Sequence, residues 1–202
     1  MKIGPKYKIA KRLGAPVFPK TQTQKFALSE ARKTKIVRKR RGQVSDYSKQ
    51  LTEKQKMRYT YGITEKQLRR YVDEAMTKSR QPITHLISRL ESRLDNVVYK
   101  LGLAKSRQAS RQMVSHGHVR INGRKLTIPS YKVCISDEIS VREGSKASGL
   151  FTAFEENYAA QGMPQWLTFD LKAMTGTKTA EPTYEPNEVL FDPEVVLEYY
   201  SR

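Results

Sequence analysis

The sequence predicts an α+β protein: a basic N-terminal arm and a helical domain, followed by two helices packed on a small, bent antiparallel sheet. Two patterns predict it. Apolar residues recur every three or four positions over residues 83–101, which is typical of a helix with one buried face. Beyond residue 118, apolar and polar residues alternate on either side of Asn122-Gly123, a dipeptide that favours the tight turn of a β-hairpin.

A strongly basic arm is predicted for residues 1–44. The chain of 202 residues has 38 Lys and Arg against 20 Asp and Glu, a net charge of +18, and its first quarter is the most basic part. Few apolar residues could anchor this arm, and Pro5, Pro16 and Pro19 interrupt helices. We therefore expect an arm that is extended or loosely ordered until it meets phosphate.

Helices follow the arm. Good helix formers fill residues 51–59, and Gly62 is placed to end that helix. Thr64 and Gln67 have the spacing of a capping box, which predicts the start of a second helix. The strongest apolar stripe then steps by threes and fours over five turns through residues 83–101. We expect its apolar members to form the core of a helical layer.

A short helix with a basic face comes next. Ser106 is a good N-cap for a helix that ends at His116. Arg107, Arg111 and Ser115 fall four residues apart within it, so they share one face. This face is polar and basic.

Antiparallel strands are predicted after this helix. Apolar and polar residues alternate around the hairpin at residues 119–128, and again at residues 131–135 and 139–141. Residues 91–143 therefore predict two helices packed on a strongly bent sheet. Near the end of the chain, residues 195–200 have the composition of a closing helix or strand.

Several function classes are excluded by the residues that the chain carries. The single cysteine, Cys134, rules out an intrachain disulfide and a thiolate zinc cluster. His116 and His118 have no third metal ligand nearby in the sequence, and no glycine pair has the spacing of a P-loop. No apolar run approaches the roughly 20 residues that cross a membrane. We therefore expect no enzyme activity, no cofactor or metal, no membrane partner and a reducing, cytosolic environment.

Nucleic-acid binding remains, and the details favour RNA. The N–H groups at the N-terminus of a helix capped by Ser106 attract phosphate, and Arg107 and Arg111 can each hold a phosphate with two hydrogen bonds. The predicted hairpin tip, residues 122–125, can bring bare backbone near a ribose-phosphate chain. Eleven tyrosines lie among the basic groups and could stack on unpaired bases.

The residues just described resemble a known family. The matching segments are RLDNVVYKLG at 93–102, Ser106-Arg107, QMVSH at 112–116 and VRINGR at 119–124. They closely resemble the S4 RNA-binding domain, which also occurs in some tyrosyl-tRNA synthetases, pseudouridine synthases and heat-shock RNA-binding proteins. Further matches, such as SDY at 45–47 and PQWL at 164–167, extend in collinear order along the chain. Together they are similar to the bacterial-type small-subunit ribosomal S4 family.

This resemblance implies a domain organisation and a set of partners. The implied parts are a basic arm at 1–44, a helical rRNA-binding domain at 45–90 completed by 185–202, an S4 domain at 91–150 and an extension at 151–184 that packs on both domains. Members of the family bind the 5′ domain of small-subunit (16S) rRNA and nucleate assembly. They also line the mRNA entry channel, contribute to translational accuracy and contact ribosomal protein S5. A cytoplasmic ribosomal location, or the plastid stroma for an organellar chain, and no homo-oligomer are implied.

The resemblance also implies which residues contact RNA. The S4 domain would contribute Arg93, Asn96, Ser106, Arg107, Arg111, Gln112, Ser115, His116, Asn122 and Arg124. The helical domain would add Lys49, Lys54, Lys56, Arg58, Tyr61 and Arg69. The arm would add Lys6, Lys8, Lys11, Arg12, Lys35, Arg38, Lys39, Arg40 and Arg41, of which those from Lys35 onward are candidates for the mRNA side or an rRNA groove.

Two other interpretations stay open at this point. An RNA-modifying enzyme that carries an S4 domain would need a separate catalytic domain of well over a hundred residues. A free-standing RNA chaperone would bind RNA without joining the ribosome. The chain also departs from the family, because its arm lacks the metal-binding cysteines of many relatives and residues 181–188 are acidic where relatives are usually more basic.

Overall fold

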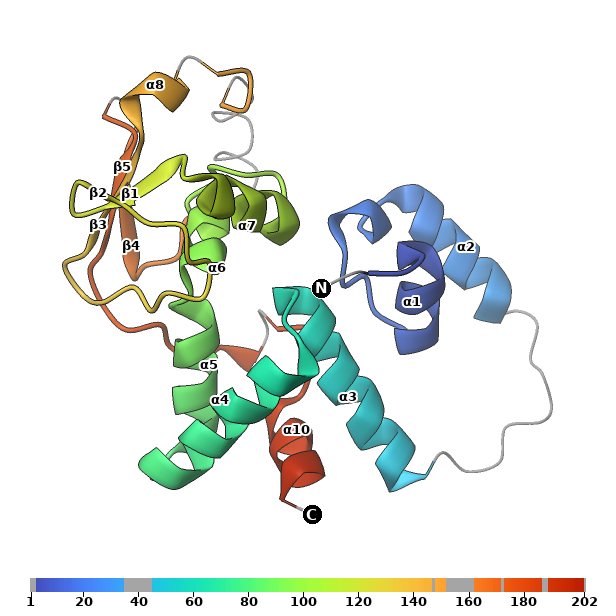
Figure 1. Ribbon diagram of the computed structural model, residues 1–202. Coiled ribbons are helices and arrows are strands. Elements are labelled where there is room, and N and C mark those ends of the chain that lie inside the picture. Colours follow the sequence, from blue (N-terminus) through green and yellow to red (C-terminus); the bar gives the residue numbers. More distant parts are fainter. Residues whose placement is uncertain are drawn as a thin grey trace. The chain divides into compact units, whose positions relative to one another are not determined.

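The structure, a computed structural model, describes residues 3–34, 45–146, 148–151, 162–171, 173–186 and 189–201 (Figure 1). The chain divides into two compact units. The helical unit comprises Met1–Ile83 and Glu185–Arg202, and the α+β unit comprises Thr84–Tyr184. Helices together with an antiparallel sheet confirm the α+β fold class.

The N-terminal residues form helices, so the prediction of an extended arm is wrong for residues 3–34. The elements are α1 (Lys6–Leu13), a 3-10 turn η1 (Pro19–Thr21) and α2 (Gln24–Thr34). Proline stands at their boundaries: Pro5 is the N-cap of α1 and Pro19 opens η1, where a missing N–H is tolerated. Gly14 ends α1 with a left-handed φ of 66°.

These helices enclose a small apolar core of their own. Its buried members come from α1, the turn after it and the first turn of α2: Ile9, Ala10, Leu13, Ala15, Val17, Phe18 and Phe26. The ring of Phe18 packs edge-on against Tyr59 at a centroid distance of 5.8 Å, which joins this core to helix α3 (Asp46–Tyr61). Lys35, Arg38, Lys39, Arg40 and Arg41 lie outside the described residues.

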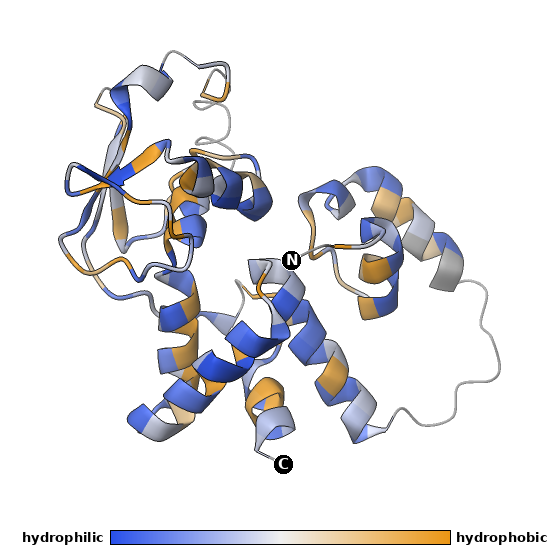
Figure 2. Ribbon diagram, viewed as in Figure 1, coloured by the Kyte–Doolittle hydropathy of each residue, from blue (hydrophilic) through white to orange (hydrophobic). Residues whose placement is uncertain are grey.

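Helix α3 ends and helix α4 (Glu65–Lys78) begins where the sequence predicts. The Ser45 hydroxyl accepts a hydrogen bond from the N–H of Ser48, and Gly62 ends α3 with a φ of 64°. Thr64 and Gln67 form the predicted capping box of α4. Figure 2 shows that hydrophilic residues predominate along both helices, with apolar residues confined to narrow stripes.

Helix α10 (Pro193–Tyr200) packs on α3 and α4 through polar contacts as well as apolar ones. The carboxylate of Glu65 accepts hydrogen bonds from Tyr200 at 2.6 Å and from Lys54 Nζ at 2.9 Å. Lys54 also lies 4.3 Å from the centre of the Tyr199 ring, a cation–π contact. One glutamate and one lysine thus tie the C-terminal helix to the helical unit.

The α10 contacts predict a dependence of stability on acid. Burial raises the pKa of Glu65, but hydrogen bonds from Tyr200 and Lys54 and the positive charges of Lys54 and Arg58 outweigh it, so the pKa is lowered from its ordinary value of 4.5. A lowered folded-state pKa gives stability that is present above the unfolded-state pKa and is lost as the pH falls through the folded-state value. We expect wild type to melt above Glu65→Gln at neutral pH, and the difference to shrink below pH 4.5.

Thermal melting of both proteins between about pH 3 and about pH 7 checks this expectation. The comparison with Glu65→Gln isolates Glu65, because Glu181 in the other unit also has a lowered pKa and contributes its own acid sensitivity. There burial raises the pKa, but hydrogen bonds from Ser88 and Lys178 and the charge of Lys178 outweigh it. A difference in melting temperature that stayed constant down to the lowest pH would contradict the role of Glu65.

The long apolar stripe folds as two helices, α5 (Pro82–Glu91) and α6 (Leu94–Lys100), so the continuous helix predicted over residues 83–101 is wrong. Arg93 has an extended backbone, with φ −69° and ψ 137°. The main-chain groups freed at the break bond to a distant loop, because Val133 N–H donates to Ser92 O at 2.8 Å and Leu94 N–H donates to Tyr131 O at 2.9 Å.

Among the described residues, the α+β unit also contains helix α7 (Arg107–His116), a five-stranded antiparallel sheet and α8 (Glu143–Lys146), which follows β3. The strands are β1 (Val119–Ile121), β2 (Arg124–Lys125), β3 (Glu138–Val141), β4 (Leu167–Asp170) and β5 (Thr175–Lys178), in the order β2-β1-β3-β5-β4. The core lies between α6, α7 and the sheet and includes Leu94, Val98, Val114 and Ile139.

Two features of the sheet differ from the prediction. Residues 131–135 form no strand, only an isolated bridge between Lys132 and Arg93, and Ile135 is exposed. Strands β4 and β5 come from the segment that was predicted as an extension. They form a hairpin in which β5 pairs with β3 and β4 lies at the edge, so both belong to the same sheet.

Candidate nucleic-acid interface

Helix α7 carries the basic face that the sequence predicts. The Ser106 hydroxyl accepts a hydrogen bond of 3.2 Å from the N–H of Ala109, which caps the helix as expected. The buried side of the helix, which includes Met113 and Val114, packs into the core. The opposite side bears predicted contact residues that are exposed or half-buried: Ser106, Arg107, Arg111, Gln112, Ser115 and His116.

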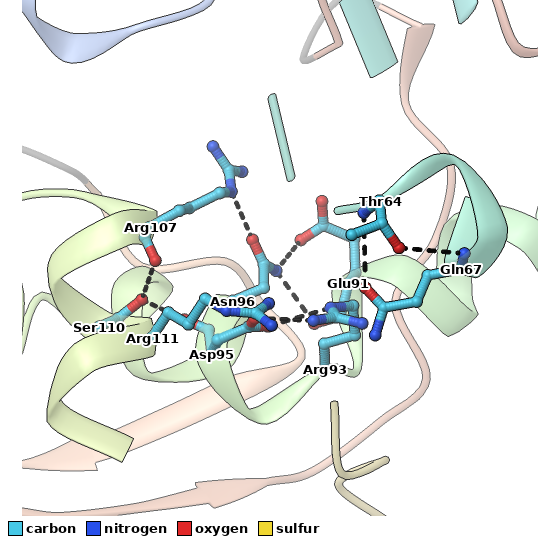
Figure 3. A network of polar contacts seen from close by, with 9 residues as sticks. All are labelled: Thr64, Gln67, Glu91, Arg93, Asp95, Asn96, Arg107, Ser110 and Arg111. Carbon is cyan, nitrogen blue, oxygen red and sulfur yellow. Dashed lines mark hydrogen bonds and ion pairs between the residues drawn. The ribbon is translucent and has the colours of Figure 1, made fainter. Parts of the chain in front are cut away.

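A buried ion pair underlies this face (Figure 3). The carboxylate of Asp95 accepts two hydrogen bonds from the Arg93 guanidinium, from Nε at 3.0 Å and from a terminal nitrogen at 2.7 Å. The same carboxylate accepts a third, from Arg111 at 3.3 Å. Ser110 of α7 donates from its hydroxyl to the main-chain oxygen of Asp95. The network fixes α6 against α7 and holds Arg111 at the surface.

Asn96 links the second arginine of the face to the same network. Its Oδ1 accepts a hydrogen bond of 2.7 Å from Nε of Arg107. Its Nδ2 donates to Glu91, to the main-chain oxygen at 3.0 Å and to the carboxylate at 2.7 Å. In Figure 3 the end of the Arg107 side chain projects away from these partners.

The predicted hairpin tip follows on the same unit. Asn122 and Gly123 have φ angles of 49° and 75°, the left-handed pair that a type I′ turn requires. The Asn122 side chain donates to Asp137 at 2.8 Å and accepts from the N–H of Glu138 at 2.9 Å, so it ties the tip to β3. Arg124 is exposed next to it. The tip therefore presents a cation on a turn of fixed shape.

The predicted contacts of the helical unit divide into exposed and buried groups. Lys8, Arg12, Lys49 and Arg69 are exposed, and Lys6, Lys11, Lys56 and Arg58 are half-buried. Lys49 and Lys56 form ion pairs with acidic neighbours on their own helix, Asp46 and Glu53. The Lys49–Asp46 pair is exposed, so it contributes little stability.

Four residues predicted to contact RNA are buried within the protein. They are Lys54, Tyr61, Arg93 and Asn96, all less than 6% exposed. Each is enclosed because it bonds or packs within the protein, as described for Lys54, Arg93 and Asn96. These four residues lie beneath the candidate interface. The exposed cations beside them form its surface.

The acidic side of the network and a buried lysine are not among the residues predicted from the sequence. Glu91 and Asp95 are not among the predicted contact residues, although each lies two positions from Arg93, a spacing that allows an ion pair. Lys178 is completely buried, and its Nζ donates to Ser92 Oγ at 2.8 Å, Val133 O at 3.1 Å and Glu181 Oε1 at 3.0 Å. It anchors β5 to the break between α5 and α6.

Two negative findings concern the described residues only. Within these residues no group of three or more His, Cys, Asp and Glu side chains is arranged to hold a metal ion. Among the described helices none has the length and apolar character needed to cross a membrane.

Comparison with known families divides the chain into two matching parts. Residues 1–91 match the family described as ribosomal protein S4/S9 N-terminal domain, and residues 92–139 match the S4 domain. The two matches adjoin at the break between α5 and α6, and the second contains α6, α7 and the hairpin.

Individual relatives are similar over most of the chain. The small ribosomal subunit protein uS4 of Syntrophomonas wolfei is 46% identical over 163 residues, which cover 81% of this chain and 78% of the relative. The protein of the same name from Persephonella marina is 40% identical over 203 residues, 98% of each chain. That from Chloroflexus aurantiacus is 38% identical over 206 residues, 99% of this chain and 98% of the relative. The chain therefore belongs to the small ribosomal subunit protein uS4 family.

Proposed function

We propose that the chain is a structural, non-enzymatic component of the small ribosomal subunit that binds small-subunit rRNA. Membership of the uS4 family supports this role, and so does the net charge of +18, which suits a polyanionic partner. The observation that carries the proposal is the basic face of α7, where two arginines are held in place by buried polar groups. A subunit component of this kind acts in the cytoplasm, on the ribosome.

The finer assignment names the RNA region and the neighbours. The chain binds the 5′ domain of the 16S rRNA early in assembly, contributes to the mRNA entry channel and to translational accuracy, and contacts ribosomal protein S5. These statements rest on the family resemblance. Phosphate contacts by the cations of both units supply affinity, and RNA shape and unpaired bases supply specificity.

A salt titration tests the proposal. Purified protein is titrated with a 5′-domain rRNA fragment and with an unrelated structured RNA of equal length, at several salt concentrations. If about 6–10 phosphates are neutralised, affinity falls by about 10³–10⁵ between about 50 mM and about 200 mM salt. We expect this steep dependence together with a preference of about a hundredfold or more for the fragment. A steep dependence without a preference would leave only a non-specific basic RNA binder and contradict the assignment.

A further inference from the structure

The Arg107 side chain is held from two directions by helix α6. Its Nε donates the hydrogen bond of 2.7 Å to Asn96 Oδ1, and its guanidinium carbon lies 4.7 Å from the centre of the Tyr99 ring. Asn96 and Tyr99 are three positions apart on α6, so they share one face of that helix. We call these two residues the α6 cradle. Together they hold the guanidinium by one hydrogen bond and one cation–π contact.

The orientation of the Asn96 amide is itself fixed by Glu91. Both hydrogens of Nδ2 are used, one on the main-chain oxygen and one on the carboxylate of Glu91, so only Oδ1 can face Arg107 (Figure 3). Asn96 is only 2% exposed, which leaves its amide no alternative partner in solvent. A neutral amide also holds Arg107 without cancelling its charge, as a carboxylate at this position would.

Helix stability does not explain a cation at this position. Arg107 is the first residue of α7, where the positive end of the helix dipole disfavours positive charge. The helix has no acidic residue in its first turn to offset that charge. A cation that is held by two contacts in such a place suits an anionic ligand.

We propose that Asn96 and Tyr99 are positioning residues that preset Arg107 for an RNA phosphate, an inference that rests on the RNA-binding role proposed above. Immobilising a long side chain opposes binding, and a side chain that is already immobilised removes this cost from the binding step. Loss of the cradle is therefore expected to weaken RNA binding about threefold to tenfold. The phosphate contact itself still forms, so the salt dependence of the affinity is unchanged.

The test is a double-mutant cycle on the 5′-domain fragment with Asn96→Ala, Arg107→Ala and the double variant. We expect Asn96→Ala to weaken binding about threefold to tenfold with the wild-type salt slope. Arg107→Ala should lower the slope of log affinity against log salt by about 0.7–0.9, the value for one lost phosphate contact. The double variant should bind like Arg107→Ala, because a cradle has no effect without the side chain that it holds.

A second variant and a spectroscopic measurement test the proposal even if Asn96→Ala does not fold. Tyr99→Leu keeps an apolar side chain but removes the ring, so it replaces Asn96→Ala in the cycle if that variant does not fold. In protein without RNA, ¹⁵N relaxation of the Arg107 Nε–H group should show a rigid side chain in wild type and a mobile one in both cradle variants. Leu167→Ala, a buried truncation in β4, is the control for a general loss of stability and should leave both readouts unchanged.

The outcomes separate this proposal from the proposed function. If wild type shows no preference for the fragment, the RNA assignment fails, while the relaxation measurement still reports on the cradle. If the preference holds but the effects of Asn96→Ala and Arg107→Ala add, or if Arg107 is equally rigid in both cradle variants, the positioning role is wrong.

Discussion

Asp95→Ala is expected to destabilise the α+β unit by about 3–5 kcal/mol, the cost of leaving a buried charge without its partner. The Arg93 side chain is completely buried and the Asp95 side chain is 5% exposed, with their closest atoms 2.7 Å apart. Without the carboxylate, the Arg93 guanidinium would stay in the interior and lose the ion pair that offsets the cost of its burial. Chemical denaturation of the variant, monitored by circular dichroism, measures the change in the free energy of unfolding.

A variant that removes both charges is the matched control for this prediction. Arg93→Met combined with Asp95→Leu deletes the ion pair but leaves no lone buried charge, so it should recover a large part of the stability that Asp95→Ala loses. If the single variant were as stable as the double one, Arg93 would have to reach solvent on losing its partner. The interpretation of a buried pair beneath α7 would then be wrong.

Arg107→Ala combined with Arg111→Ala should weaken binding to the 5′-domain fragment on the order of a hundredfold, with little change in melting temperature. Charge-assisted hydrogen bonds contribute about 1.5–3 kcal/mol each, and two are removed. The stability cost is small because both side chains are partly exposed, and the Arg111 pair with Asp95 is the longer one at 3.3 Å. Fluorescence anisotropy at fixed salt and thermal melting give the two quantities.

The control for this prediction is a double variant that loses the same net charge at a different place in the α+β unit. Lys132→Ala with Arg142→Ala removes two exposed cations of the α+β unit that lie outside α7 and the hairpin tip. It should cost much less affinity, because its effect is limited to long-range attraction. Equal losses for the two double variants would mean that total charge decides binding and that the α7 face has no special role. If the variant with Arg107→Ala and Arg111→Ala unfolded, the two arginines would instead have a structural role.

Local signals in the sequence predicted the ends of elements well. Ser45, Gly62 and Thr64 act through bonds to residues within four positions, and Asn122-Gly123 forms its turn through its own φ angles. Such interactions depend on few residues, so a short stretch of sequence contains what determines them. The N-terminal prolines were misjudged for a related reason, because a proline forbids the interior of a helix but suits its first positions.

Features that depend on distant residues could not be predicted in this way. The break at Ser92-Arg93 exists because the loop at residues 129–133 and Lys178 supply its hydrogen-bond partners. These partners lie about 40 and 86 residues further along the chain. Apolar residues recur every three or four positions on both sides of that break. The sequence pattern therefore does not indicate that the helix is interrupted. The burial of Arg93 and Asn96 likewise follows from partners, and residue type alone places arginine and asparagine at the surface.

The discontinuity of the helical unit determines the order in which the chain can complete its folding. Lys54 and Glu65 are synthesised more than a hundred residues before their partners Tyr199 and Tyr200, and the whole α+β unit lies between them. During synthesis the α+β unit can close first, because all five strands belong to one uninterrupted stretch of chain. The helical unit stays incomplete on the nascent chain until α10 emerges. The docking of α10 therefore pairs segments more than a hundred residues apart and is the last contact of the helical unit to form.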